Sequence, residues 1–462
     1  MTTRYSVSEE ETRTVRVREV AESIQYGHTA SAVVRKQGPR FLRITDIQDG
    51  KVDWESVPSC DIVAEDVPKY RLSKGDLVFA RTGATTGKSF LIRDCPEAVF
   101  ASYLIRVRAS SDVDPRYLAL FFQSPDYWQQ IERGKRGIGQ PNVNGKVLGE
   151  VELPLPPLDE QQLIVAEIEK QFTRLDAGVA SLKQVQTALK RYRASVLKAA
   201  CEGRLVLTEA ELARKENRSY ETGEQLLQRV LKERREKWIG KGKYKEPQPP
   251  KKHSYAMVPD GWTVASIEDL SYLDVGFAFK SEEFSESGIR LLRGENIEPG
   301  ALRWTDTRYW PKSKLDPFRS LLVGEGDIVL AMDRPLISTG LKIARARADD
   351  LPCLLVQRMA RFRLVDESMV GFLFLALNTE AFRRHLLGGQ TGTQLPHISG
   401  GQISSFPVLI PPVAEEKRIV DEVERRLSVV NEFEAVLNAN LLRAAGFRQS
   451  LLARAFANNM RS

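Results

Sequence analysis

Residues 153–203 begin LPLPPLDEQQLIVAEIEKQF and end SVLKAACEG, and residues 408–458 begin VLIPPVAEEKRIVDEVERRL and end SLLARAFAN. The two stretches align without a gap, because each position of the second follows its counterpart by 255 residues, as Pro411 follows Pro156. An internal repeat of this kind decides the architecture before any local pattern does. We therefore predict two similar modules, each closed by a long helix that begins after a Pro-Pro pair.

Both stretches carry a narrow apolar seam in steps of three and four residues, a spacing that is typical of a coiled coil. The first seam consists of Ile164, Ile168, Phe172, Leu175 and Leu182, and the second of Ile419, Val423, Leu427, Val430 and Leu437. Glu434 interrupts the second seam. Two helices that each pack on their own module would also be apolar on one side. Because the seams match in length and position, we instead expect the helices to pair with each other as an antiparallel coiled coil.

Each module begins with short strands that are followed by a helix. A Gly-Asp pair precedes a predicted strand at 77–80 in the first module and at 328–331 in the second, and apolar helices are predicted at 117–122 and 372–377. The predicted fold class is α+β, with two repeated mixed α/β domains joined by the two paired helices. The predicted boundaries are 1–157 for the first module, 158–202 for its helix, 203–258 for a connector, 259–412 for the second module and 413–462 for its helix.

The composition predicts a globular protein with an acidic partner. The chain has 462 residues, of which 42% are hydrophobic and 28% charged, and this length favours two or more domains. No apolar run is long enough to span a bilayer, and the N-terminal segment does not read as a signal peptide. Four cysteines without metal-like or disulfide-dense spacing favour a reducing cytoplasm. The net charge of +7 indicates an acidic partner, most commonly nucleic acid.

The connector between the modules combines a predicted helix with a strongly basic run. Apolar residues recur on one side of 225–238, and residues 229–252 contain ten lysines and arginines against three glutamates. The proline-rich end of this run favours an extended linker. The basic residues form either a solvated connection or a strap that contacts phosphates.

The segment GATTGKS at 83–89 is similar to a phosphate-binding P-loop but lacks its spacing. A P-loop has four residues between its glycines and then opens a helix, whereas three residues separate Gly83 from Gly87 and the next residues read as a strand. We therefore predict a hairpin that carries Arg81 and Lys88 to the surface. No metal-ligand spacing or catalytic triad can be assembled around His28, His253, His385 and His397. The chain is predicted to have no catalytic residue and no metal site, and thus to bind.

Polar residues on glycine-rich loops recur at matching places in both modules, and their side chains are of types that hydrogen-bond base edges and phosphates. In the first module the DNA-binding candidates are Tyr26, His28, Thr29, Arg43, Arg81, Thr82, Lys88, Lys135, Arg136, Gln140 and Asn142. In the second they are Lys280, Arg293, Arg334, Thr391, Thr393, Gln394 and His397. Any one of these could be an ordinary solvated loop residue. Their recurrence in both halves favours a shared binding face.

Several motifs together resemble those of one protein family. These are PPLDEQQLIVAEIE at 156–169, SVLKAACEGRL at 195–205 and Pro259-Asp260-Gly261-Trp262 at the start of the second module. The Gly-Asp pair before a strand and the Gly/Thr/Gln loop before the Pro-Pro pair add to them. With these motifs the chain resembles, over nearly its whole length, the specificity (S) subunits of Type I restriction–modification enzymes. The second copy departs from the pattern, with VAEEKRI in place of LDEQQLI.

This resemblance implies a function for each part. Each module would be a target recognition domain that reads one half of a bipartite, asymmetric sequence in double-stranded DNA. The paired helices would act as a ruler for the unread spacer and as the dock for two methyltransferase (M) subunits, which would use S-adenosylmethionine to methylate adenine. Restriction (R) subunits would add ATP- and Mg-dependent translocation and cleavage. The chain itself would hold no cofactor, be catalytically silent and act in the cytoplasm of a prokaryote.

Other classes of function predict different behaviour. A nuclease or NTPase that uses Lys88 would turn over its substrate as the purified chain, but the motifs it needs are missing. A structural spacer would show no sequence preference, which the varied loops disfavour. The main alternative is a stand-alone DNA-binding regulator with two recognition modules, which would bind its site without a partner.

Overall fold

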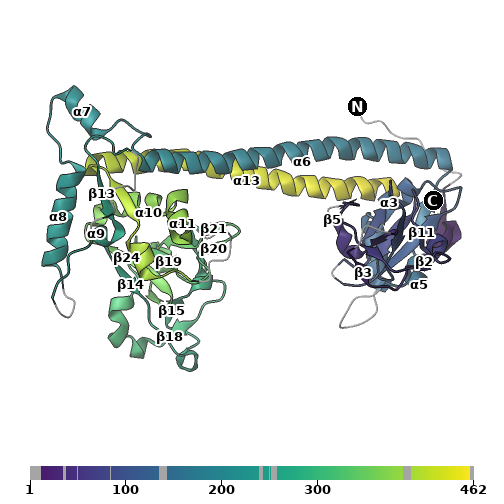
Figure 1. The fold of residues 1–462 in the computed structure, drawn as a ribbon, viewed down its shortest axis with the longest axis horizontal. Coiled ribbons are helices and arrows are strands. Elements are labelled where there is room, and N and C mark those ends of the chain that lie inside the picture. The colour runs from purple at the N-terminus through teal and green to yellow at the C-terminus, as the bar shows by residue number, and fades with distance from the viewer. Residues whose placement is uncertain are drawn as a thin grey trace. The chain divides into compact units, whose positions relative to one another are not determined.

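The computed structural model describes residues 12–34, 38–48, 50–83, 85–134, 143–238, 243–248, 250, 257–388 and 397–457. The chain divides into two compact units: unit 1 comprises Met1–Gln184 and Val436–Ser462, and unit 2 comprises Val185–Ala435. Each unit contains one module and part of both long helices, α6 (Leu158–Cys201) and α13 (Val413–Ala457). In Figure 1 the purple and blue strands of unit 1 accordingly lie beside the yellow C-terminal end of α13. The domain boundaries drawn from the sequence stay a prediction.

Unit 1 is built on a four-stranded antiparallel sheet in the order β2-β11-β8-β9. Its strands are β2 (Ala21–Tyr26), β8 (Leu77–Ala80), β9 (Ser89–Leu91) and β11 (Leu104–Ala109). A second sheet contains the parallel pair β4 (Arg40–Leu42) and β10 (Ala98–Phe100). The helix α3 (Pro115–Phe121) packs into the same core as β8 and β11. Because β8 and β9 pair directly, the interpretation of GATTGKS as a hairpin rather than a P-loop is confirmed.

Unit 2 repeats this arrangement. Its antiparallel sheet has the order β14-β24-β19-β22, formed by β14 (Ser271–Val275), β19 (Ile328–Ala331), β22 (Ile343–Arg345) and β24 (Met359–Leu364). The strands β15 (Ile289–Leu292) and β23 (Cys353–Leu355) form the equivalent parallel pair, and α10 (Val370–Leu377) takes the place of α3. The register is also shared, because Leu104 pairs with Ala80 in unit 1 and Met359 with Ala331 in unit 2. The predicted α+β class with two repeated mixed domains is confirmed.

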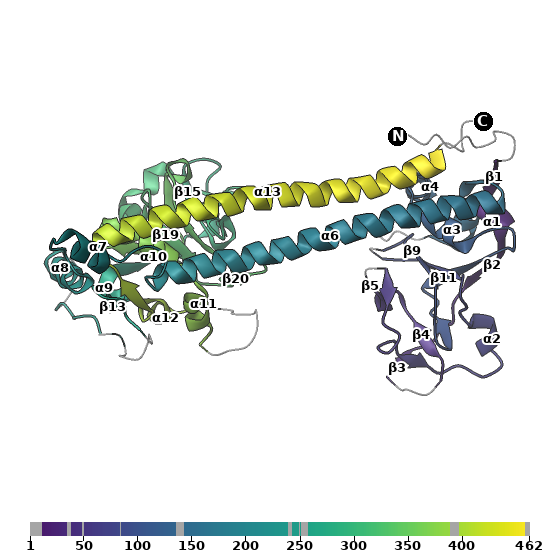
Figure 2. The ribbon, with the colours of Figure 1, turned by 90° about the horizontal axis from the view of Figure 1, so that it is seen from above.

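The two long helices pair antiparallel within each unit. In unit 1 an Nη1 atom of Arg448 lies 2.9 Å from a carboxylate oxygen of Asp176. In unit 2, where Figure 2 shows the second half of α6 beside the first half of α13, Arg193 Nη2 lies 3.0 Å from Glu434 Oε2. Glu434 therefore interrupts the apolar seam with an ion pair rather than with an unpaired charge. Of the predicted seam, Ile168, Phe172, Ile419, Val423, Val430 and Leu437 are buried, and Ile164, Leu175, Leu182 and Leu427 are half-buried.

The core of each unit includes the end of a long helix. Leu452 and Phe456, from the last turns of α13, pack into the core of unit 1. Val196, Leu197 and Ala200, from the last turns of α6, pack into the core of unit 2. The first module thus completes its core with the end of α13, and the second module completes its core with the end of α6.

The connector packs on unit 2. It contains α7 (Glu209–Glu216) and α8 (Gly223–Glu236), and α8 covers most of the helix predicted at 225–238. Glu415, at the start of α13, accepts hydrogen bonds from the backbone N–H of Glu209 (2.7 Å) and from Trp262 Nε1 (2.9 Å). These contacts fix the connector, the second module and α13 to one another. No helix in the described part of the chain is long and apolar enough to cross a membrane.

Gly276 provides a test of the packing in unit 2. A Cβ built on Gly276 would lie 2.2 Å from the carbonyl oxygen of Val356 and 2.4 Å from that of Leu355, and neither backbone oxygen can move aside alone. We expect Gly276→Ala to lower the free energy of unfolding of unit 2 by about 1–3 kcal/mol, as overpacking does elsewhere. The measurement is urea denaturation. Gly401→Ala is the matched control, because its Cβ would meet nothing within 4 Å. Equal midpoints for the two variants would contradict this account.

Candidate nucleic-acid interface

In each unit, three chain segments meet at one end of the main sheet, where one central strand ends and the other begins. In unit 1 the backbone N–H of Arg81 donates to the carbonyl of Tyr103 (3.0 Å), and the N–H of Val143 donates to the carbonyl of Arg81 (3.0 Å). In unit 2 the N–H of Met332 donates to the carbonyl of Arg358 (2.8 Å), and that of Ile398 to the carbonyl of Met332 (2.8 Å). The same backbone frame therefore occurs twice, and we call it the recognition edge of each unit.

A fourth segment, the loop after the first strand of the main sheet, joins the recognition edge. The N–H of Gly27 donates to the carbonyl of Leu104 (3.2 Å), and that of Gly276 to the carbonyl of Met359 (3.1 Å). Both glycines are needed for this approach, since a Cβ on Gly27 would lie 2.3 Å from the carbonyl oxygens of Phe100 and Ala101. The loop that carries Tyr26, His28 and Thr29 is thereby held against the strands.

The recognition edge of unit 1 brings several predicted residues together. The hydroxyl of Tyr26 accepts a hydrogen bond from the backbone N–H of Gly145 (2.8 Å), and the guanidinium of Arg81 lies 5.0 Å from the centre of the Tyr26 ring. Thr82 follows Arg81 and is half-buried, whereas Thr29 is exposed. His28 lies slightly apart, with its ring 5.1 Å from that of Tyr70. A cation held on an aromatic face beside an open loop is suited to contact DNA.

The recognition edge of unit 2 carries a different set of side chains. His397 Nδ1 lies 2.7 Å from one carboxylate oxygen of Asp333, and Arg358 donates to the other oxygen. Burial opposes ionisation of this carboxyl, but the hydrogen bonds from His397 and Arg358 hold the pKa of Asp333 below its ordinary value. Arg334 is exposed next to it. The sequence pointed to Arg334 and His397 but missed Asp333, Arg358 and, in unit 1, Tyr103.

Two predicted arginines are held by carboxylates of their own loops. Arg43 donates to both oxygens of Asp46 (2.7 and 3.0 Å), and this hydrogen bonding raises the pKa of Arg43 above its ordinary value. Arg293 pairs with Glu295 and lies 3.2 Å from Asp306. A role in DNA binding for these two would require the guanidinium to leave or share its carboxylate. Lys280 is exposed before the short helix Ser281–Glu283.

Seven predicted residues lie outside the described residues, so the structure does not place them. They are Lys135, Arg136, Gln140, Asn142, Thr391, Thr393 and Gln394.

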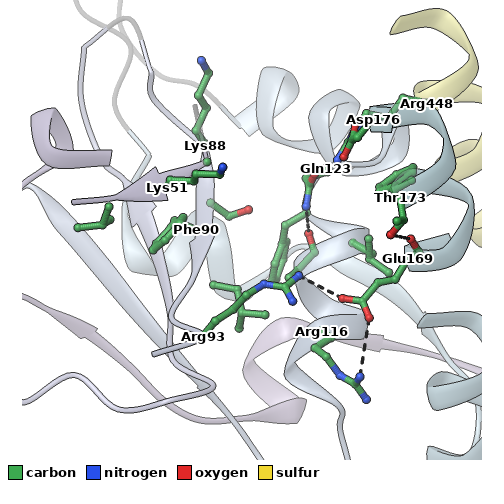
Figure 3. A pocket seen from close by; sticks show the side chains of 18 of the residues that line it. Lys51, Lys88, Phe90, Arg93, Arg116, Gln123, Glu169, Thr173, Asp176 and Arg448 are labelled. Carbon is green, nitrogen blue, oxygen red and sulfur yellow. Dashed lines mark hydrogen bonds and ion pairs between the residues drawn. The ribbon is translucent and has the colours of Figure 1, made fainter. Parts of the chain in front are cut away.

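Lys88, whose backbone carbonyl accepts from the N–H of Ala80 (2.9 Å), lines a pocket of about 1020 Å³ in unit 1. Figure 3 shows Lys51 and Lys88 on one side of this pocket and Asp176 with Arg448 on the other. Glu169 is held between Arg93 (3.1 Å) and Arg116 (3.8 Å). Among the described residues no ion pair is formed by Lys51 or Lys88, so their ammonium groups suit an anion such as a phosphate.

A buried arginine braces the loops of each unit, and sequence reasoning missed both. Arg106 on β11 donates to the backbone carbonyl of Arg71 (2.6 Å), and Arg361 on β24 donates to that of Ser320 (2.9 Å) and to Asp274 (2.6 Å). The signal was present, because Arg361 follows Arg106 by the repeat spacing of 255 and each interrupts an apolar strand. Since buried guanidinium groups need such partners, these arginines position loops rather than contact a ligand.

The described residues contain no group of three or more His, Cys, Asp or Glu side chains that could hold a metal ion. That the chain carries no catalytic residue, metal or cofactor of its own remains an expectation from the sequence.

Comparison with known proteins shows which proteins the chain is similar to. Residues 9–191 match the family model described as Type I restriction modification DNA specificity domain. The chain is 27% identical over 377 residues to the Type I restriction enzyme EcoAI specificity subunit of Escherichia coli, across 71% of this chain and 62% of that protein. It is 25% identical over 436 residues to the EcoKI specificity subunit of Escherichia coli strain K12, across 91% and 82% of the two chains. The chain thus spans less than two thirds of the EcoAI subunit.

A solved structure shares the fold. A chain from a structure described as "Structural basis underlying complex assembly and conformational transition of the type I R-M system" superposes with a TM-score of 0.63, covering 97% of this chain and 98% of that one at 19% identity. Residues 9–191 thus match a Type I restriction modification DNA specificity domain, and over most of its length the chain is similar to Type I specificity subunits. The resemblance seen in the sequence motifs is confirmed.

Proposed function

We propose that this chain is the DNA-recognition subunit of a Type I restriction–modification system and that each unit reads one half of a bipartite, asymmetric target. The observation that carries the proposal is the recognition edge, which recurs with the same backbone hydrogen bonds and different side chains. Unit 1 has Arg81, Thr82 and Tyr103 at the positions where unit 2 has Met332, which is buried in the core, and the polar Asp333 and Arg358. Different donors and acceptors on one frame are what two different half-sites require.

Two linked readers increase discrimination beyond what one can supply. A mismatched base pair costs only about 1–3 kcal/mol, so a domain that reads a few base pairs selects weakly. A link between two such domains makes the second binding event intramolecular. In this proposal the paired helices set the unread spacer between the half-sites.

The helices also carry exposed apolar side chains, and three of them (Val185, Tyr192 and Phe447) continue the predicted apolar seams but are not buried. In unit 1 the exposed side chains are Leu163, Val436, Leu442 and Phe447, and in unit 2 Val185, Tyr192, Val429 and Phe433. Exposed apolar groups on a helix are candidate sites for contact with another protein. We infer that a methyltransferase subunit docks on the helices of each unit, two in all, which favours the specificity subunit over a stand-alone regulator. S-adenosylmethionine, ATP and Mg would then belong to methyltransferase and restriction subunits, in a prokaryotic cytoplasm.

A selection experiment tests the proposed function. The chain, with and without its candidate adenine methyltransferase, is used to select from a random duplex library at a stated salt concentration. We expect a motif in two blocks with a fixed gap, methylated only when both proteins are present. A single uninterrupted motif bound by the chain alone would instead identify a stand-alone regulator.

Arg81→Ala is expected to relax base preference in one block only. Loss of a bidentate arginine contact costs about 1–3 kcal/mol of discrimination at the position that it reads. Lys88→Ala is the matched comparison, because Lys88 is exposed and lines the pocket with Lys51, whereas Arg81 makes the backbone hydrogen bonds of the recognition edge. It should weaken binding to all sequences and reduce the slope of log affinity against log salt by about 1. If Arg81→Ala instead weakened binding to all sequences equally, Arg81 would be a phosphate contact as well.

A further inference from the structure

At the recognition edge of unit 2, the side chains of Arg358 and His397 both contact the carboxylate of Asp333. Asp333 follows β19, Arg358 precedes β24, and His397 pairs with Asp333 through a β-bridge. One oxygen of Asp333 accepts from Arg358, and the other lies 2.7 Å from Nδ1 of His397. A carboxylate engaged on both oxygens cannot rotate freely, so the Nη1 atom of Arg358 that it accepts from is held in place.

The backbone at this edge is strained. Arg358 has φ = 62° and its neighbour across the edge, Arg334, has φ = 42°, in the left-handed region that side chains other than glycine rarely adopt. Among the described residues one further non-glycine residue has positive φ, Asn217, which ends α7 as a helix cap. Strain of this kind persists where function requires a particular geometry.

These side chains face solvent rather than the core. The side chains of Arg358 and His397 are 65% and 53% exposed. Exposed ion pairs contribute little to folding, so stability does not explain the strain. Two further cations, Arg334 and Lys342, lie near this set together with one carboxylate, Glu295. Exposed donors in such surroundings suit DNA.

The set is confined to unit 2. Through the shared backbone frame, Arg358 corresponds to Tyr103 and Asp333 to Thr82 in unit 1. By contrast, the bracing arginines Arg106 and Arg361 are the same in both units. The arginines that hold the loops in place thus recur in both units, whereas the exposed side chains of the recognition edge differ between the units.

We propose that Arg358, held by Asp333, reads a guanine in the half-site of unit 2, and that His397 is a positioning residue for the Asp333 carboxylate. The guanidinium has two parallel N–H donors, which match the O6 and N7 acceptors that guanine presents in the major groove. Asp333 leaves one edge of the guanidinium free for the base. The inference rests on the proposed function, since it assigns a base to one of its half-sites.

The test repeats the library selection with full-length variants in the presence of the methyltransferase. Arg358→Ala is expected to lose about tenfold or more in guanine preference at one position of one block, with the other block unchanged. Asp333→Ala should weaken preference at the same position. Arg384→Ala, at an exposed arginine on α11 (Glu380–Leu387) of the same unit, is the matched control and should leave every position unchanged.

The variant Arg358→Gly distinguishes a loss of base recognition from a loss of stability. Glycine tolerates positive φ, so this variant should unfold at a denaturant concentration no lower than wild type while still losing the guanine preference. If the Arg358 variants keep the base preference of wild type at every position of a two-block motif, the inference is overturned and the proposed function still stands. An equal loss of affinity for all DNA sequences, with the slope of log affinity against log salt smaller by about 1, would also overturn the inference, because Arg358 would then contact a phosphate. No two-block motif with wild type would reject the proposed function itself.

Discussion

Replacement of Phe456 by alanine is expected to destabilise unit 1 by about 3–5 kcal/mol. Phe456 comes from the last turn of α13, yet its ring is fully buried in unit 1. It meets the rings of Tyr117 and Phe121 edge-on, and both centroids are 5.3 Å away. Truncation would remove this apolar burial and both aromatic contacts, and it would leave a cavity that the surrounding helices and sheet can fill only in part.

Segment-resolved hydrogen exchange measures the effect, because the two units can open separately. We expect β8 and β11 to lose protection in Phe456→Ala, while β19 and β24 keep theirs. Phe447→Ala is the matched control, since this ring lies on the same helix but is 49% exposed. If β8 and β11 stayed as protected as in wild type, the end of α13 would not belong to the core of unit 1.

Glu416→Gln is expected to make unit 2 more stable at pH 8 and to reduce its pH dependence. Glu416 is buried at the start of α13, and burial raises the pKa of its carboxyl from 4.5 to about 8, with the nearby Asp366 carboxylate adding to the rise. The repeat places Gln161 at the same position in unit 1. There the Gln161 side chain accepts from the N–H of Asp114 (2.9 Å) and donates to the carbonyl of Pro156 (2.8 Å).

The direction of the pH effect follows from proton binding. Between pH 4.5 and about 8 the folded chain keeps a proton on Glu416 that the unfolded chain has released. The stability of unit 2 should therefore be highest below pH 4.5 as far as this group is concerned, fall as the pH rises, and level off above pH 8. The fall is at most about 5 kcal/mol, since one pKa unit corresponds to about 1.4 kcal/mol.

Denaturant unfolding of wild type and variants between pH 5 and 8 measures this dependence. The glutamine variant should show a clearly smaller fall than wild type, with the remainder due to other buried carboxyls of unit 2, such as Glu415, whose pKa burial also raises. Glu422→Gln is the matched control on α13: hydrogen bonds from Arg425 and Arg426 lower the pKa of Glu422 to about 2, so it does not titrate in this range. That variant should keep the slope of wild type. A wild-type profile without a fall toward pH 8 would show that Glu416 is ionised in the folded chain.

Much of the fold was predictable because it repeats. The spacing of 255 between the Pro-Pro pairs predicted two modules, and the apolar seams predicted antiparallel pairing, which the ion pairs of Arg448 and Arg193 confirm. The connector was less predictable. Its basic run favoured a solvated linker, but α8 packs on the second module within unit 2 because Leu226, Leu227 and Val230 become buried there.

The candidate site was predictable only in part. Glycine-rich loops indicated the segments around Arg81 and His397, because such loops leave polar side chains exposed. They did not indicate Tyr103 or Arg358, which lie at strand ends rather than on loops with a recognisable composition. Nor could the sequence show that Arg43 and Arg293 are engaged by carboxylates of their own loops.

The sequence by itself determined the two-module order, the paired helices and the resemblance to Type I specificity subunits, because these depend on periodicity and motifs that lie along the chain. The tertiary structure decided which side chains share the recognition edges. That depends on backbone hydrogen bonds between distant segments, such as those joining Met332 to Arg358 and Ile398. Such contacts form only when the sheet brings the segments together, and no local pattern records them.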